Sequence, residues 1–122
     1  LQQIAQSRMY VAGALMYIGE KEQAVAEADA TLAELEGQST PCGRGIVSVL
    51  LQVGTIFSAA GGPKESLPYL ERALACTRTD SSAAPFAARI AGAIAWSCRR
   101  LDDQENAERW RAIESSLRSS QP

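Results

Sequence analysis

The sequence predicts an all-α domain made of three antiparallel helix pairs, and three observations support this prediction. Alanine is abundant while aromatic residues make up only 6% of the chain, which favours close-packed helices over a β-sandwich. Apolar residues recur at helical spacing between breaks rich in glycine and proline. The pattern also repeats along the chain. With 122 residues, the chain is long enough for one domain, which we take to span residues 1–122.

The first pair is predicted within residues 5–38. Its first helix carries apolar residues at steps of seven, four and three, namely Ile4, Val11, Leu15 and Ile18. We expect this stripe to form the buried face of the helix, which Gly19 ends. A second stripe runs through Ala24, Ala28, Leu32 and Leu35. It stops at Gly37, a residue suited to a helix C-terminus.

The second pair is predicted within residues 47–80. Its first helix has Leu50, Val53, Gly54 and Phe57 on one face. Gly61 and Gly62 end that helix, and Pro63 suits the first turn of the next one. Pro68 removes a backbone hydrogen bond, so we expect a kink or a late start there.

The third pair is predicted within residues 88–120, after a loop from Arg78 to Ala83 in which Ser81 or Ser82 is the expected N-cap. Its first helix begins near Pro85, and Asp102 or Asp103 caps the second. The last helix carries the apolar residues Ala107, Trp110, Ile113 and Leu117.

Short patterns repeat between the three pairs with shifts of 42 and 41 residues. They are Val11-Ala12-x-x-Leu15, Val53-Gly54-x-x-Phe57 and Ile94-Ala95-x-x-Cys98, each followed nine residues later by a small residue, Ala24, Ser66 or Ala107. Small residues let two helices of a hairpin cross closely, and stacked hairpins then bury one continuous core. The alternative is a helical bundle without true repeats.

The spaced small and large residues resemble the tetratricopeptide repeat (TPR) family. The middle repeat carries the resemblance best, through Leu50, Val53-Gly54, Phe57, Gly61, Ser66, Leu70 and Ala73. The period near forty residues is similar to the extended repeats of kinesin light chains and of bacterial signal-transduction and LuxR-type regulators. The resemblance implies a right-handed superhelix with a concave groove that binds an extended peptide or a partner helix.

The resemblance also implies which residues face the groove. The partner-binding residues expected from it are Tyr10, Met16, Tyr17, Gln52, Thr55, Arg89, Trp96, Arg99 and Arg100, with Gln6, Met9, Gly13, Ser48, Leu51 and Ser58 in the same register. Tyrosine and tryptophan give large contact areas, and arginine pairs with carboxylates. An acidic or amphipathic peptide is therefore the expected partner. For Trp96, packing between repeats is as well supported as contact with a partner in the groove. For Tyr17, packing is the favoured interpretation.

Nothing in the sequence predicts catalysis, a cofactor or a metal site. The chain has no histidine, and Cys98 lacks a neighbouring base. Three cysteines without metal spacing are interpreted as reduced thiols in a cytoplasmic protein. The net charge of −2 argues against direct nucleic-acid binding, and no segment predicts a membrane span.

The acidic residues are concentrated near the beginning of the chain. Glu20, Glu27 and Glu34 are expected to form a solvated face, or to meet the arginine-rich end of a neighbouring molecule in self-association. The first residue is leucine, which suggests a fragment of a longer protein. The expected function is a scaffold or adaptor module for protein–protein interaction. The alternative is the partner- or ligand-sensing segment of a bacterial transcriptional regulator.

Overall fold

The structure, a computed structural model, describes residues 2–38 and 40–120, and side chains of the first helix from residue 6 onward. The elements are α1 (Gln2–Tyr17), α2 (Lys21–Gln38), α3 (Arg44–Ala59), α4 (Pro63–Thr79), the 3-10 helix η1 (Ser81–Phe86), α5 (Ala87–Arg100) and α6 (Gln104–Ser119). No strand occurs in these described ranges, so the prediction of an all-α chain is confirmed.

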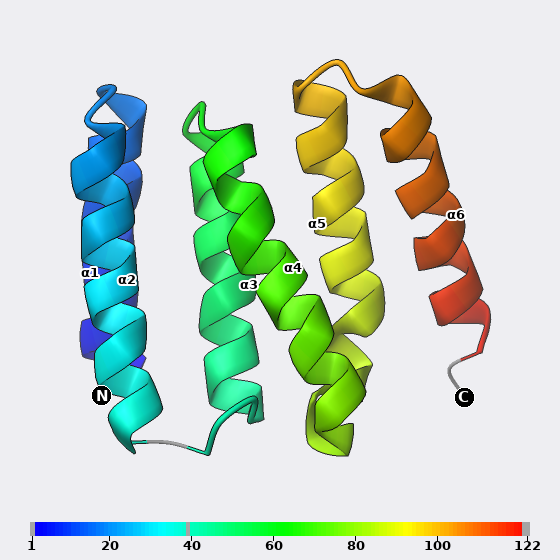
Figure 1. Ribbon diagram of the computed structural model, residues 1–122, viewed down its shortest axis with the longest axis horizontal. Helices are drawn as coiled ribbons and strands as arrows, with labels where there is room; N and C mark the ends of the chain where they lie inside the picture. The colour runs from blue at the N-terminus through cyan, green and yellow to red at the C-terminus, as the bar shows by residue number, and fades with distance from the viewer. Residues whose placement is uncertain (1, 39, 121–122) are drawn as a thin grey trace.

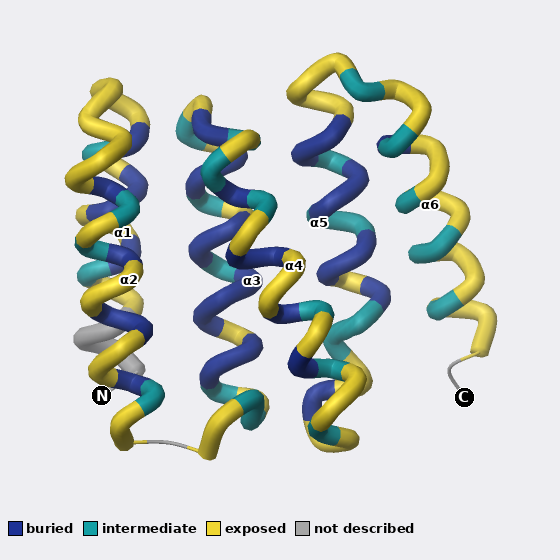
Figure 2. The backbone as a smooth tube through the Cα atoms, in the orientation of Figure 1, coloured by how far each residue is buried: buried dark blue, intermediate teal, exposed yellow. Residues whose placement is uncertain are grey.

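The six α-helices form three hairpins that stand side by side (Figure 1). In this view α2 and α4 lie in front of α1 and α3. The core follows α3, which has nine buried residues, and continues into α5 (Figure 2). By contrast, α6 has only Ala107 buried. Burial is therefore concentrated in α3 and α5 and is lowest in α6.

The three hairpin turns have the same backbone geometry. Each contains a residue with positive φ, namely Gly19 (φ 93°), Gly61 (φ 95°) and Asp102 (φ 59°). The next amide of each turn donates to the carbonyl five residues back: Glu20 to Leu15 at 2.9 Å, Gly62 to Phe57 at 2.8 Å and Asp103 to Cys98 at 2.9 Å. This is the Schellman arrangement of a helix C-terminus. These residues are related by the shifts of 42 and 41 that the sequence shows, so the turns repeat with the sequence.

Asp102 is the one non-glycine residue among these three turn positions. Because a Cβ is disfavoured at positive φ, Asp102→Gly should raise the free energy of unfolding by about 0.5–1 kcal/mol. Urea denaturation followed by circular dichroism would measure this gain. Gly61→Ala makes the opposite change at the equivalent turn and should destabilise by a similar amount. A loss of stability in Asp102→Gly would contradict the assigned strain.

The small residues predicted at the helix crossings are all buried. They are Ala12, Gly54 and Ala95 on the first helices and Ala24, Ser66 and Ala107 on the second helices. At Gly54 a Cβ would lie only 2.4 Å from Cδ2 of Leu70 on α4. The backbone of α3 therefore approaches α4 so closely that no side chain fits there.

Three buried hydroxyl groups join the second hairpin to the third. Ser97 on α5 donates to Oγ of Ser58 on α3 at 3.1 Å, and its Oγ lies 3.0 Å from that of Ser66 on α4. The Ser66 hydroxyl also lies 2.7 Å from the carbonyl of Pro63, to which it donates. Because the Ser97 hydroxyl donates to Ser58 and the Ser66 hydroxyl donates to the Pro63 carbonyl, burying these hydroxyl groups costs little.

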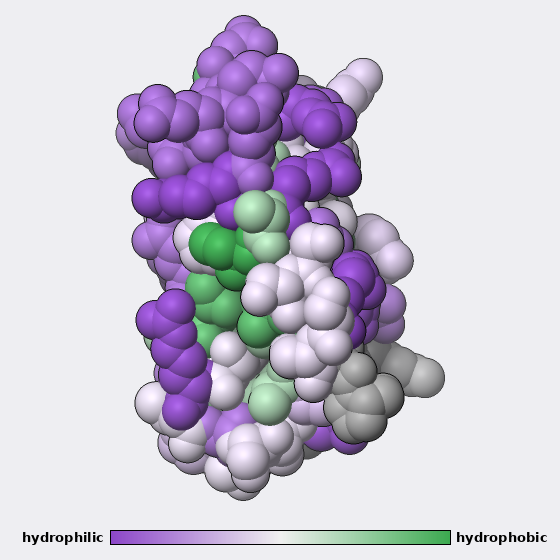
Figure 3. Space-filling model, turned by 90° about the vertical axis from the view of Figure 1, so that its right-hand side faces the viewer, coloured by the Kyte–Doolittle hydropathy of each residue, from purple (hydrophilic) through white to green (hydrophobic). Residues whose placement is uncertain are grey.

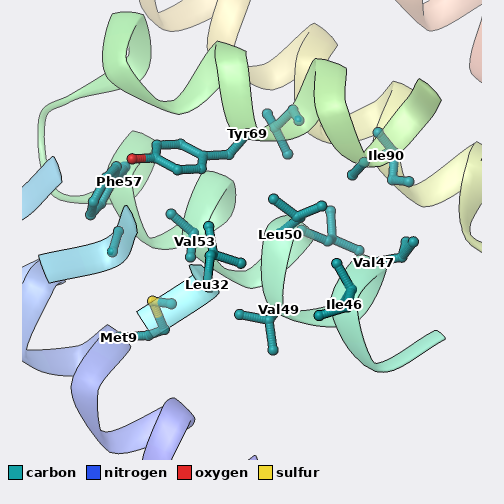
Figure 4. Packing of buried hydrophobic residues seen from close by; sticks show 14 of the residues in the cluster. Met9, Leu32, Ile46, Val47, Val49, Leu50, Val53, Phe57, Tyr69 and Ile90 are labelled. Carbon is teal, nitrogen blue, oxygen red and sulfur yellow. The ribbon is translucent and has the colours of Figure 1, made fainter. Parts of the chain in front are cut away.

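Tyr69 links the second hairpin to the first. Its ring packs edge-on against Phe57 with centroids 5.6 Å apart, and its hydroxyl donates to Asp29 on α2 at 2.7 Å. Burial, together with this bond, raises the pKa of Tyr69. Figure 4 shows both rings beside Val53, with Leu32 and Met9 from the first hairpin close by. The large side chains thus fill the space between successive hairpins.

The face that α1 buries differs from the predicted one. Val11 is 54% exposed and Ile18 is 69% exposed, while Leu15 is half-buried. The side chain of Ile4 lies outside the described residues. The buried face consists instead of Met9, Ala12, Gly13 and Met16. Residues 9–18 are apolar or small on every side, so the helical period alone did not distinguish the two faces.

The prediction of three reduced cysteines is wrong. Cys42 and Cys76 form a disulfide that joins the loop before α3 to the C-terminal turn of α4. Cys98 is a buried free thiol, and its burial raises its pKa. Because disulfides are rare in reducing compartments, the observation behind the expected cytoplasmic location no longer holds. No helix among the described residues is long and apolar enough to cross a membrane.

One helix start agrees with the sequence-based expectation and one differs. α4 begins at Pro63, which lies in its first turn as predicted, and continues through Pro68 without a late start. η1 is capped by Asp80, whose carboxylate accepts from the amide of Ser82, rather than by a serine. Asp103 caps α6 as predicted and accepts from the amide of Asn106 at 3.2 Å. The bonds from Asn106 lower the pKa of Asp103.

The expectation of a solvated acidic stripe on α2 holds only for part of it. Arg8 on α1 bonds to Glu27 at 2.9 Å and also pairs with Glu34. These bonds, led by the one to Glu27, raise the pKa of Arg8. Two of the three acids are therefore neutralised within the chain and are not free to meet a neighbour.

Candidate partner-binding surface

The first helices of the three hairpins enclose a shallow hollow of about 430 Å³, which we call the wall hollow. Its lining residues are Gln6 and Tyr10 of α1, Ser48, Val49, Leu51, Gln52, Thr55 and Ile56 of α3, and Arg89 of α5. Helix α3 forms its floor because the other faces of this helix are packed into the core. The hollow is open to solvent, as a surface for an extended ligand requires.

Four of the predicted partner-binding residues meet in the wall hollow. Tyr10 is 61% exposed and stands at the α1 side, opposite Arg89 at the α5 side. Gln52 and Thr55 lie between them on α3. The Thr55 hydroxyl already donates to the carbonyl of Leu51 at 2.8 Å. Tyr10, Gln52 and Arg89 therefore offer the side chains with the most freedom to contact a ligand.

The lining of the hollow includes one basic residue, Arg89, and a second arginine, Arg44, contacts the same Phe86 ring outside the lining. The guanidinium carbon of Arg89 lies 5.7 Å from the centroid of the Phe86 ring, and that of Arg44 lies 5.6 Å from the same centroid. Neither arginine has a salt-bridge partner among the described residues. Two unpaired guanidinium groups held by one ring form an attractive site for a carboxylate.

Sequence reasoning missed Arg44. Arg44 is the first residue of α3, and the sequence of the preceding loop does not indicate that Arg44 lies near α5. The only signal was Phe86, an aromatic residue just before a helix start in an otherwise polar and alanine-rich segment. Its ring brings together two arginines that are 45 residues apart in sequence.

Met16 does not face the groove as expected, and neither do Met9, Gly13 and Ser58. Met9, Gly13, Met16 and Ser58 are buried. The sulfur of Met16 would lie 2.5 Å from a Cβ at Gly62, so Met16 fills the space beside the second hairpin turn. In α1 it is Tyr10, and not Met16, that lines the hollow.

The remaining predicted residues do not line the wall hollow. Tyr17 is 78% exposed and stands at the end of α1. Trp96 is half-buried, with the guanidinium of Arg100 lying 5.4 Å from its ring centroid. Arg99 is exposed in the last turn of α5, where its charge complements the helix dipole.

A second hollow lies beside α6 and is larger, at about 800 Å³. Its lining includes the apolar residues Leu74, Pro85, Trp110, Ile113 and Leu117. Figure 3, which faces the α6 end of the molecule, shows apolar side chains gathered below a hydrophilic upper part. The sequence placed these apolar residues on the last helix, and in the structure Trp110, Ile113 and Leu117 are only half-buried.

Among the described residues, no group of three or more possible ligands could hold a metal ion. Comparison of the chain with protein-family models, with curated proteins and with solved structures found no significant match.

Proposed function

We propose that this chain is a protein-interaction module that binds an acidic, amphipathic peptide or partner helix in the wall hollow. The observation that carries the proposal is the meeting of Tyr10, Gln52 and Arg89, from three different hairpins, around one open hollow. The TPR resemblance adds a right-handed superhelical stack in which such a wall is concave. In this proposal the chain acts by binding and has no catalysis of its own.

The chemistry of the hollow indicates which part of a partner lies where. A carboxylate of the partner pairs with Arg89 and Arg44, because a charge-assisted bond to an unpaired guanidinium is stronger than a neutral one. An apolar side chain of the partner packs on the exposed ring of Tyr10, which supplies contact area at low entropic cost. Gln52 is placed to bond the partner backbone between these two anchors.

The experiment begins with a random peptide library displayed on phage and selected on the intact, disulfide-bonded chain. Selected peptides should be enriched in aspartate or glutamate and in one large apolar residue. In calorimetric titrations of the best peptide, Arg89→Ala should weaken binding by about ten- to a hundredfold, since a bond to a charged group contributes about 1.5–3 kcal/mol. Tyr10→Ala should weaken binding by a similar factor, since truncation of an aromatic anchor in an interface costs about 2 kcal/mol.

Arg78→Ala is the matched control because it removes an exposed arginine that lines the α6 hollow instead. Its affinity for the selected peptide should equal that of the unmodified chain. Selection of basic peptides, or equal losses in Arg78→Ala and Arg89→Ala, would refute the proposed site.

A further inference from the structure

The exposed large apolar side chains are concentrated on one helix. Of the five in the described part of the chain, four lie along α1 and the turn residue that follows it: Tyr10 (61%), Val11 (54%), Tyr17 (78%) and Ile18 (69%). Together with exposed Ala14 they form what we call the α1 stripe. Clusters of exposed apolar residues on an otherwise polar surface mark interaction sites.

In α3, the residues equivalent to the α1 stripe pack against another helix. Val53, Ile56 and Ala60 stand 42 residues after Val11, Ala14 and Ile18. In α3 this face packs on α1: Val53 is 1% exposed, and Cγ2 of Ile56 lies 2.4 Å from the place of a Cβ on Gly13. The same face of α1 lies uncovered in the monomer.

The α1 stripe is symmetric about Ala14. Tyr10 and Val11 precede it by four and three residues, and Tyr17 and Ile18 follow it by three and four. A two-fold axis through the two Ala14 residues would place an aromatic and an aliphatic side chain of one copy against the matching pair of the other. The small residue at the centre lets the two helices approach closely. Such self-complementarity is what an isologous dimer requires.

The distribution of charge also favours a second copy of this chain as the partner of the α1 stripe. Residues 9–18 contain no charged side chain, and the charge of nearby Arg8 is compensated by Glu27 and Glu34, so two copies meet without repulsion. The other end of the molecule is unsuited to receive the stripe. Glu114 and Arg118 of α6 occupy the positions of buried Thr31 and Leu35 in α2, and they pair with each other at 2.9 Å. Head-to-tail stacking would bury these charges.

We propose that the α1 stripe is a homodimer interface in which two copies pack antiparallel across a two-fold axis at Ala14. Buried aromatic side chains cover about 150–250 Å² each, so the four partly exposed side chains supply on the order of 500 Å² per copy. This is less than the roughly 800 Å² per partner of a stable complex. The dimer is therefore weak, with a Kd in the micromolar range, and concentration-dependent.

The first test is sedimentation equilibrium of the 122-residue chain from about 1 µM to 1 mM. The mean mass should rise from 13.0 kDa toward twice that value and no further. Ile18→Glu should weaken dimerisation at least tenfold, because the substitution enters the interface twice. Leu101→Glu, a matched change at a 41% exposed residue between α5 and α6, should leave the Kd unchanged. Both sites are exposed, so thermal unfolding should confirm that both variants fold.

The second test fixes the orientation by oxidative cross-linking. The native disulfide is already formed and Cys98 is buried, so a new surface cysteine is the reactive one. Ala14→Cys should cross-link to its copy, whereas Val11→Cys should not, because the two-fold separates its two copies by about 9 Å along the helices. A monomer at all concentrations, growth beyond a dimer, or cross-linking of Val11→Cys alone would overturn the proposal. Tyr10 belongs to both the α1 stripe and the wall hollow, but Ile18 does not line the hollow. Ile18→Glu should therefore lose dimerisation and keep peptide binding, which separates the failure of this proposal from that of the proposed function.

Discussion

Replacing Gly54 with leucine is expected to lower the free energy of unfolding by about 3 kcal/mol or more. Even a Cβ at this position would lie 2.4 Å from Cδ2 and 2.5 Å from Cγ of Leu70. Leu70 is fully buried and cannot move aside, so a leucine at position 54 must force α3 and α4 apart. The melting midpoint should fall by roughly 10 °C for a chain of this size.

Gly37→Leu is the matched control for this substitution. Gly37 also lies in a helix, the last part of α2, but nothing stands within 4 Å of an added Cβ. Since leucine is a better helix former than glycine, this variant should be neutral or slightly stabilised. Thermal and urea unfolding monitored by circular dichroism measure both variants. An unchanged midpoint for Gly54→Leu would contradict the close crossing of the two helices.

Removing the disulfide should have the next largest effect. Cys42 and Cys76 are 34 residues apart, and opening a loop of this length costs about 3–4 kcal/mol in the chain-entropy description. The variant with both Cys42→Ser and Cys76→Ser should therefore be less stable than the oxidised chain by this amount. A reductant should destabilise the unmodified chain similarly and leave the double variant unaffected.

Thiol counting provides an independent check of the bond. The denatured but unreduced chain should react as one free thiol, from Cys98, and the reduced chain should react as three. Three reactive thiols without reduction would show that the bond does not form under the conditions of purification. In that case the double serine variant should also match the unmodified chain in stability.

The sequence was sufficient to predict the helix pairs and their repeat, because both depend on local chemistry. The turn glycines are favoured by their own positive φ, and Gly54 is required by the Leu70 side chain packed against it, so such residues mark their sites directly. The common turn geometry at Gly19, Gly61 and Asp102 confirms the spacing that the sequence patterns predicted. Asp102, which the sequence offered as an alternative cap of the last helix, instead takes the positive-φ turn position 41 residues after Gly61, and Asp103 is the cap.

The features that the sequence did not predict depend on contacts between distant segments. The disulfide forms because the loop before α3 returns Cys42 to the end of α4, and cysteine spacing carries no signal of this approach. The pairing of Arg44 and Arg89 on Phe86 likewise requires the packed structure. In α1 the apolar residues surround the helix, so Met16 was expected in the groove and Val11 in the core, and both positions are reversed.

The uneven burial of the three hairpins means that the molecule should not open all at once. Helix α6 contributes a single fully buried residue, whereas α3 contributes nine. Repeat proteins open in units whose local free energies follow such differences. The last helix can therefore fray and detach while α3, the floor of the wall hollow, remains closed, so transient opening at the chain's end leaves the candidate binding surface assembled.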